Sequence, residues 1–183
     1  MARIGDGSTR LVVVRGNSGS GKSSTAQEIR RRLGYGVAWV EQDYLRRTLL
    51  REHDRAGQPN VGLIELTVRY ALDHGYHVVL EGILNNRTYG EMIRRLVVDH
   101  VGVTGAYYFR LPFEETIRRH STRELAKVVT AEQMREWYRD LDLLGVPGEQ
   151  VIGIDSTLDQ TVDRILADLD WTSGGAVNEP IGS

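Results

Sequence analysis

The sequence lacks several features that would narrow its function at once. None of its 183 residues is cysteine, which excludes disulfides, thiol catalysis and thiolate metal sites. No apolar run reaches the ~18 residues of a membrane-spanning helix, and the first residues lack the apolar core of a signal peptide. The 23 basic and 25 acidic side chains leave a formal charge of −2, so no overall charge attracts a polyanion. We therefore expect a cytoplasmic protein without a membrane partner.

What the sequence does contain is an alternation of short apolar runs with segments of helical period. This alternation is typical of a parallel sheet wrapped by helices, and it predicts an α/β fold. The runs are almost continuously apolar, as in strands that are covered on both faces. The expected strands are residues 11–14, 37–41, 77–81, 103–109 and 150–154. We expect a single domain over residues 1–171 and a disordered tail over residues 172–183.

Three helix starts are predicted by capping boxes. In each, a threonine hydroxyl is followed three residues later by an acceptor side chain that can bond back to the threonine N–H. The pairs are Thr88 with Glu91, Thr130 with Gln133, and Thr157 with Gln160.

A glycine-rich loop follows the first expected strand. Residues 16–23 read GNSGSGKS and match the pattern G-x-x-x-x-G-K-[ST], with a helical segment after them. The glycines let backbone N–H groups surround phosphates at a helix N-terminus. Lys22 brings positive charge to the outer phosphates, and the Ser23 hydroxyl can bind Mg²⁺. The predicted nucleotide-binding residues of this loop are Gly16, Asn17, Ser18, Gly19, Ser20, Gly21, Lys22, Ser23 and Ser24.

Other classes of nucleotide-binding protein carry motifs that this sequence does not have. It contains neither the N-K-x-D guanine motif of GTPase switches nor the LSGGQ-like segment of transporter ATPases. Ring-forming ATPases need a longer core with an added helical lid. The class that remains is the small kinases, in which a second substrate accepts the γ-phosphate.

A carboxylate follows the expected second strand, at the edge where a doubly wound sheet opens its ligand crevice. Asp43 is a candidate general base for an acceptor hydroxyl, and Arg46 follows it at the start of a helix. The alternative is that Asp43 caps the helix that contains Leu45. Both interpretations stay open, since one carboxylate can cap and catalyse.

Two further charged features are expected at the same edge of the sheet. Glu81 ends the apolar third strand, where a Walker-B acid reaches a metal ion through water, so Ser23 and Glu81 are the predicted Mg²⁺ residues. Arg119 and Arg123 lie four residues apart on one helix face, which suits the charge of a phosphoryl transition state. A solvated basic face is the alternative for this pair, and we expect Arg118 at the surface.

These residues together resemble the kinase domain of 5′-polynucleotide kinase. That family has an R-N-S-K-R lid segment and then a V-x-x-x-x-L-R-x-M-Y-K helix, and residues 119–123 and 129–139 stand in those positions here. Chloramphenicol phosphotransferases, zeta toxins and gluconate kinases belong to the same wider set of small P-loop kinases, the AAA_33 and zeta-toxin-like group. The resemblance extends roughly from residue 10 to residue 170, although only the loop and the lid are specific.

The resemblance implies a P-loop NTPase fold with a five-stranded parallel sheet in the order 2-3-1-4-5. It also implies a hinged helical lid over about residues 113–140, with ATP and Mg²⁺ as cofactors. Carried over by position, Asp43 is the general base and Arg46 contacts the acceptor region. Lys22 clamps the γ-phosphate, and Arg119 and Arg123 are the lid arginines. The adenine is expected near residues 155–157.

The acceptor itself is open at this point. We favour a hydroxyl of a small molecule over the 5′-hydroxyl end of a nucleic acid, because the chain has no basic surplus and Glu52 and Asp54 dilute its local basic strip. That strip consists of Arg46, Arg47, Arg51 and Arg55. A nucleotide-gated binding protein without an acceptor is the alternative from another class. The residues predicted to bind the acceptor are Asp43, Arg46, Arg47, Asn85 and Arg87. Asn85, Asn86 and Arg87 are equally consistent with the turn before a helix.

Overall fold

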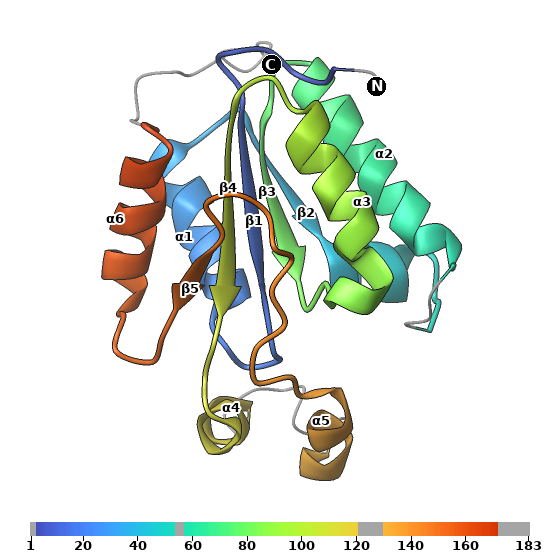
Figure 1. Cartoon of the computed structure of the whole chain (residues 1–183), viewed down its shortest axis with the longest axis vertical. Helices are drawn as coiled ribbons and strands as arrows, with labels where there is room; N and C mark the ends of the chain where they lie inside the picture. Colours follow the sequence, from blue (N-terminus) through green and yellow to red (C-terminus); the bar gives the residue numbers. More distant parts are fainter. Residues whose placement is uncertain (1–2, 54–56, 121–129, 172–183) are drawn as a thin grey trace, which may run out of the picture.

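The protein is a parallel sheet with helices on both faces, as Figure 1 shows. The computed structural model describes residues 3–53, 57–120 and 130–171. The strands are β1 (Arg10–Gly16), β2 (Val37–Glu41), β3 (His77–Gly82), β4 (Val103–Phe109) and β5 (Gln150–Ile152). They lie in the order β2-β3-β1-β4-β5, and every pairing is parallel. The predicted fold class and strand order are therefore confirmed, although β5 ends two residues earlier than expected.

The helices form two layers and a separate pair. Helices α1 (Lys22–Leu33) and α6 (Leu158–Asp168) cover one face of the sheet, and α2 (Pro59–Asp73) and α3 (Asn86–Asp99) cover the other. A short π-helical segment, η1 (Tyr44–Leu49), follows β2. Helices α4 (Phe113–His120) and α5 (Ala131–Trp137) lie together beyond the carboxyl ends of the strands. No helix in the described part of the chain is long and apolar enough to span a bilayer.

The central strand β1 has an apolar side chain on each face of the sheet. Leu11 and Val13 belong to the core under α2 and α3, whereas Val12 and Val14 belong to the core under α1 and α6. All four side chains are fully buried. Because side chains alternate along a strand, a strand covered on both faces must be apolar at every position, as the sequence indicated.

The predicted helix starts are confirmed at two of three places. Thr130 and Thr157 form complete capping boxes at the starts of α5 and α6. The prediction at Thr88 is wrong, because Asn85 caps α3 by accepting a hydrogen bond from Thr88 N at 2.9 Å. Asparagine is a stronger N-cap than threonine, so the helix begins one turn earlier.

A buried arginine at the end of β1 ties distant segments together. Arg15 is fully buried, and its guanidinium donates to the Leu84 carbonyl at 3.2 Å. It forms ion pairs with Asp142 at 2.7 Å and Glu149 at 3.3 Å, and it lies over the Tyr108 ring at 5.2 Å. Burial lowers the pKa of Arg15 and the two carboxylates oppose that shift. The guanidinium thus joins β1 to the chain after β3 and to the segment that returns from α5.

At the opposite end of the sheet, His100 is buried between two hydroxyls. Its Nε2 lies 2.9 Å from Thr9 Oγ1 and its Nδ1 lies 2.7 Å from Thr104 Oγ1. Burial and, to a smaller extent, the charge of Arg10 lower the pKa of His100, Asp6 opposes them, and the net result is a pKa of about 4. The ring is therefore neutral in the folded protein at pH 7.

We predict that His100 makes the protein lose stability in mild acid. Its folded pKa lies below the unfolded value, so its contribution is complete above about pH 6.5 and is lost as pH falls toward about 4. The full loss is about 3 kcal/mol in the free energy of unfolding. Urea unfolding at several pH values should give a flatter pH dependence for His100→Gln than for the wild type. An equal pH dependence of the free energy of unfolding in the two proteins would contradict the role of His100 in the acid loss.

We also predict that Arg15→Met lowers the free energy of unfolding by about 3 kcal/mol or more, because it leaves two carboxylates without their buried partner. Arg110→Met is the matched control, since Arg110 pairs with Asp140 where both side chains are about half exposed. That surface pair should contribute less than about 1 kcal/mol. Chemical unfolding of both variants measures the difference, and equal losses would argue against a special role for Arg15.

Candidate active site

The phosphate loop lies between β1 and α1, where three glycines hold positive φ angles. Gly16, Gly19 and Gly21 have φ of 145°, 79° and 101°. A Cβ on Gly16 would lie 2.5 Å from the Phe109 carbonyl oxygen, and one on Gly19 would lie 2.7 Å from that of Thr116. Only glycine allows this conformation and this approach. The lack of a Cβ at these glycines lets the loop backbone lie close to β4 and α4, and the loop leads directly into the N-terminus of α1.

Lys22, the first residue of α1, is buried and its amine turns back into the loop. Lys22 Nζ donates to the Asn17 carbonyl at 2.8 Å and lies 3.4 Å from Ser20 Oγ. The loop thus surrounds a positive charge at a helix N-terminus, which is a favourable place for an anion.

Ser23 and Glu81 lie side by side, as the sequence predicted for a metal site. Ser23 Oγ donates to Glu81 Oε1 at 3.2 Å, while Glu81 Oε2 is buried without a well-formed hydrogen bond. Burial raises the pKa of Glu81, and the charge of Lys22 and the nearby Trp39 indole oppose the shift. A buried carboxylate oxygen without a well-formed hydrogen bond, next to a hydroxyl, fits an oxygen-preferring cation such as Mg²⁺.

The described residues contain no group of three or more His, Asp or Glu side chains that could hold a metal ion by themselves. A cation at Ser23 and Glu81 would therefore need further oxygen ligands from a phosphate or from water.

Asp43 lies two residues beyond β2 and is held by two arginines. Its Oδ1 accepts from Arg46 Nη2 at 2.8 Å and from Arg47 Nε at 3.1 Å. The side chain of Asp43 makes no capping bond to η1, so the capping interpretation is wrong. Arg46 is buried and also donates to the Glu52 carbonyl at 3.2 Å. The side chain of Asp43 is 43% exposed, so solvent or a ligand can reach its carboxylate.

The carboxylates at this edge of the sheet influence one another. Glu41 and Glu81 are paired in the register of β2 and β3, and Asp43 follows Glu41 by two residues. Burial raises the pKa of Glu41, and the charges of Glu81 and Asp43 raise it further. The edge therefore concentrates negative charge beside the positive phosphate loop.

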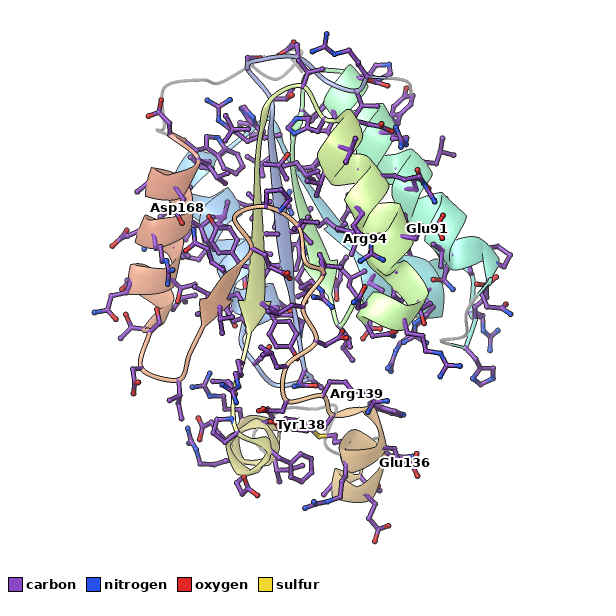
Figure 2. All side chains as sticks on the ribbon, viewed as in Figure 1. Glu91, Arg94, Glu136, Tyr138, Arg139 and Asp168 are labelled. Carbon is purple, nitrogen blue, oxygen red and sulfur yellow. The ribbon has the colours of Figure 1, made fainter. Side chains whose placement is uncertain are left out.

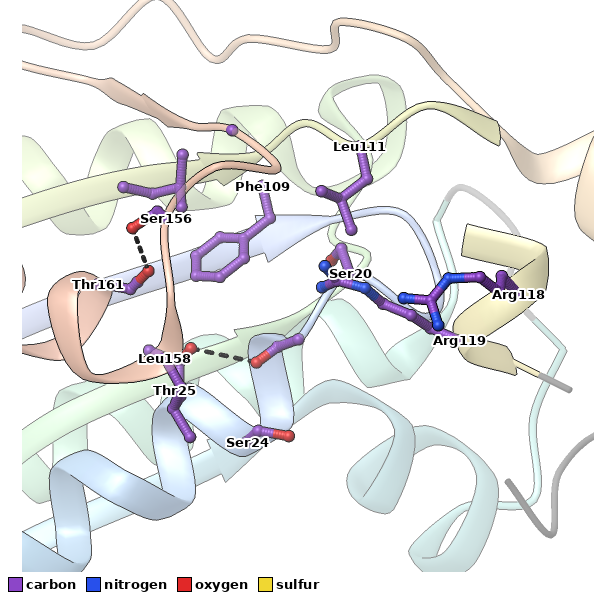
Figure 3. Close-up of a pocket in the computed structure, with 13 residues that line it drawn as sticks. Ser20, Ser24, Thr25, Phe109, Leu111, Arg118, Arg119, Ser156, Leu158 and Thr161 are labelled. Atoms are coloured by element: carbon purple, nitrogen blue, oxygen red, sulfur yellow. Dashed lines mark hydrogen bonds between the residues drawn. The ribbon is translucent and has the colours of Figure 1, made fainter. Parts of the chain in front are cut away.

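A cavity of about 340 Å³ opens next to the phosphate loop, between the loop, β4, α4 and the chain after β5 (Figure 3). Its apolar lining comes from Phe109, Leu111, Ile152 and Leu158, and its polar lining includes Ser20, Gly21, Ser24 and Ser156. Arg119 reaches over the loop, with Nη1 3.9 Å from where a Cβ on Gly21 would stand. Its Nε donates to Glu115 Oε1 at 2.6 Å.

The structure bears differently on the expectations for Arg118 and Arg123. Arg118 was expected at the surface, and although its side chain is 69% exposed it also lines this cavity. Arg123 lies outside the described residues, so its pairing with Arg119 on one helix face stays a prediction.

In the loop after β3, the side chains of Asn85 and Asn86 make hydrogen bonds to the protein itself. Asn85 caps α3, and Asn86 donates its backbone N–H to Asp142 at 2.8 Å and its side chain to the Leu143 carbonyl at 2.8 Å. The exposed Arg87 makes no polar contact with the other residues that the structure describes. Of this group, Arg87 is the side chain that is open to a ligand.

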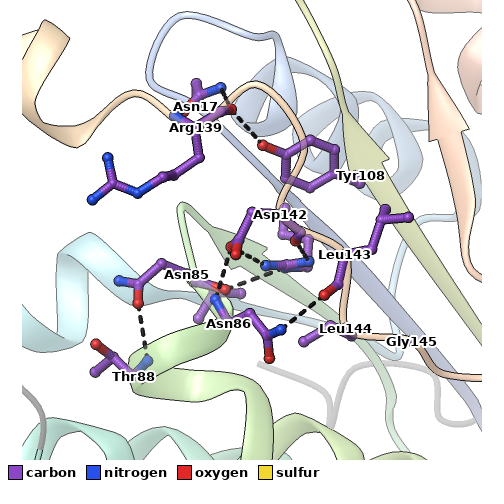
Figure 4. A network of polar contacts seen from close by, with 12 residues as sticks. Asn17, Asn85, Asn86, Thr88, Tyr108, Arg139, Asp142, Leu143, Leu144 and Gly145 are labelled. Carbon is purple, nitrogen blue, oxygen red and sulfur yellow. Dashed lines mark hydrogen bonds and ion pairs between the residues drawn. The ribbon is translucent and has the colours of Figure 1, made fainter.

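Figure 4 shows a contact between the phosphate loop and the chain after α5. Asn17 Nδ2 donates to the Arg139 carbonyl at 2.6 Å, and Arg139 N–H donates to Asn17 Oδ1 at 2.9 Å. Sequence reasoning missed both this contact and the role of Arg15. The sequence did contain a signal for Arg15. Like Glu81, Arg15 is a charged residue at the end of an apolar strand, where charged side chains are rare.

Comparisons with known proteins agree with this fold. No curated protein sequence matches the chain. The APS kinase CysC of Mycobacterium tuberculosis, in complex with AMPPNP and APS, matches with a TM-score of 0.68 and 20% identity, over 90% of this chain and 99% of that one. A gluconokinase from Sinorhizobium meliloti matches with a TM-score of 0.61 and 19% identity, over 90% and 93% of the two chains.

The Pnkp1/Rnl/Hen1 RNA repair complex matches with a TM-score of 0.56 and 18% identity, over 72% of this chain and 43% of that chain. Identities this low establish a shared fold. The model of the family AAA_33, described as an AAA domain, matches residues 11–144. That match spans the phosphate loop, Asp43, Glu81 and Arg119, so the chain belongs to the AAA domain family AAA_33.

Proposed function

We propose that this protein is an ATP-dependent kinase that transfers the γ-phosphate to a hydroxyl of a small molecule. The observation that carries the proposal is the position of Asp43, a reachable carboxylate at the same edge of the sheet as Lys22 and Glu81. A phosphate donor and a hydroxyl acceptor need these groups within one crevice.

The donor half of the site is the phosphate loop and the cavity beside it. The triphosphate would lie on the loop around Lys22, with the base and sugar in the apolar cavity between Phe109 and Leu158. Ser23 and Glu81 would hold Mg²⁺, which supplies charge neutralisation at the phosphates when bound. Arg119, and Arg123 by resemblance, would meet the charge that develops in the transition state.

The acceptor half of the site depends on Asp43. Its carboxylate would accept the proton of the acceptor hydroxyl as the oxygen forms a bond to the γ-phosphorus and the bond to the β-phosphate oxygen breaks. Arg46 and Arg47 would fix the orientation of that carboxylate, and Arg87 would contact the acceptor.

The 5′-hydroxyl end of a nucleic acid is the second candidate acceptor. It is favoured by the structural likeness to the RNA repair complex. The buried, ion-paired state of Arg46 argues against it, because that side chain is not available to a phosphate backbone as part of a basic strip. We therefore retain the small molecule as the first candidate.

A single labelling screen distinguishes these acceptors. The protein is incubated with γ-labelled ATP and Mg²⁺ against pools of sugars, nucleosides, nucleotides and antibiotics, and separately with a 5′-hydroxyl oligonucleotide. Label in a small molecule supports the proposal, and label in the oligonucleotide supports the second candidate. ATP binding without transfer to any acceptor would favour a nucleotide-gated binding protein.

We predict that Asp43→Asn lowers the rate of transfer by at least about 100-fold while ATP binding is retained, because a positioned base contributes on this scale. Glu91→Gln removes one carboxylate from the exposed surface of α3 and is the matched control, for which the rate should stay unchanged. Product formation and equilibrium ATP binding are measured for both variants. Normal transfer by Asp43→Asn would remove Asp43 from the mechanism.

A further inference from the structure

Asn17 is the second residue of the phosphate loop, and its side chain binds a segment 122 residues away. The carboxamide pairs with both backbone groups of Arg139: Nδ2 donates to the carbonyl at 2.6 Å, and Oδ1 accepts from the N–H at 2.9 Å. Asn17 is only 5% exposed. A two-point contact sets orientation as well as distance, and it needs a side chain that both donates and accepts.

Arg139 marks the place where the chain leaves α5 and returns to the sheet (Figure 2). Its carbonyl also accepts a hydrogen bond from Tyr108 Oη at 2.8 Å. The preceding residue, Tyr138, donates from its hydroxyl to the Leu111 carbonyl at 2.9 Å, just before α4 begins. Both connections between the α4–α5 pair and the sheet therefore meet beside Asn17.

The backbone of the same asparagine contacts the loop lysine. The Asn17 carbonyl accepts from Lys22 Nζ at 2.8 Å. A phosphate bound in the loop competes for that amine, so nucleotide binding changes the surroundings of Asn17 directly. Asn17 thus contacts both the Lys22 amine, where a phosphate would bind, and the chain that follows α5.

We propose that Asn17 is a positioning residue that couples the nucleotide state of the phosphate loop to the position of α5. Its backbone responds to the Lys22 amine, and its carboxamide transmits the change to Arg139. This inference rests on the proposed function only in requiring that ATP binds the loop.

Hydrogen exchange followed by mass spectrometry tests the coupling without any acceptor. Amide exchange is measured with and without saturating ATP in peptides that cover residues 16–24 and residues 131–140. In the wild type, ATP should slow exchange in both peptides by at least about threefold, because coupled segments open less often together. In Asn17→Ala, ATP should still slow exchange in the loop but change that of residues 131–140 by less than about 1.5-fold.

Arg139→Ala is the matched control, because the contact is made to the backbone of Arg139 and not to its side chain. This variant should keep the wild-type response of α5. A purely structural role for Asn17 would raise exchange in α5 equally with and without ATP, so the ATP-dependent difference is the decisive measurement. An ATP response of α5 in Asn17→Ala that equals the wild type overturns the inference, as does a wild type whose α5 does not respond to ATP.

Tyr108→Phe is a second control, because it removes the other donor to the Arg139 carbonyl and leaves both Asn17–Arg139 bonds in place. In this variant α5 should keep its ATP response, and loss of that response with Asn17 intact would overturn the assignment of the coupling to Asn17. Asn17→Ala keeps the backbone carbonyl that accepts from Lys22, so its ATP binding is measured alongside the exchange. Because no acceptor enters the experiment, failure of phosphoryl transfer in the screen would refute the kinase and leave this result standing.

Discussion

The backbone approach of the phosphate loop to its neighbours is the constraint on which the site depends. Gly16 leaves no room for a Cβ against β4, and Gly19 leaves none against α4. A side chain at either glycine would therefore push the loop away from the helix that carries Arg119 or from the strand that carries Phe109. Lys22 and Ser23 follow this loop at the start of α1, and Ser20 and Gly21 of the loop line the cavity beside it.

Buried charge serves two purposes in this fold, and its hydrogen bonding distinguishes them. The Arg15 guanidinium forms ion pairs with two carboxylates, donates to a carbonyl and lies over an aromatic ring. These contacts leave none of its donors for a ligand. Glu81 accepts a hydrogen bond from Ser23 on Oε1, whereas its Oε2 is buried without a well-formed hydrogen bond. A fully satisfied buried charge is an anchor, whereas a half-satisfied one beside a phosphate loop is a candidate ligand site.

The two halves of the candidate site are built differently. The proposed donor side combines an apolar cavity with a glycine-rich loop whose backbone shape the sequence motif specifies. The acceptor side consists of charged side chains, with Asp43 held by Arg46 and Arg47 and with the loop after β3 pinned by Asp142. This difference explains why a sequence motif identifies the proposed phosphate-donor side but not the proposed acceptor. The motif specifies a backbone shape, whereas the side chains that would select an acceptor vary within one fold.

The sequence by itself determined the class of fold, the positions of the five strands and the helix starts at Thr130 and Thr157. These features follow from signals within a few residues: strand alternation, glycine spacing and capping pairs. It misled at Thr88, where the neighbouring Asn85 is the better cap. At Asp43 it left both catalysis and capping open, and the structure removes the capping alternative because the carboxylate accepts from Arg46 and Arg47. Only the tertiary structure decided the contacts of Arg15 with Asp142 and of Asn17 with Arg139, because they join residues more than 120 positions apart. No local pattern encodes which distant backbone a buried side chain will meet.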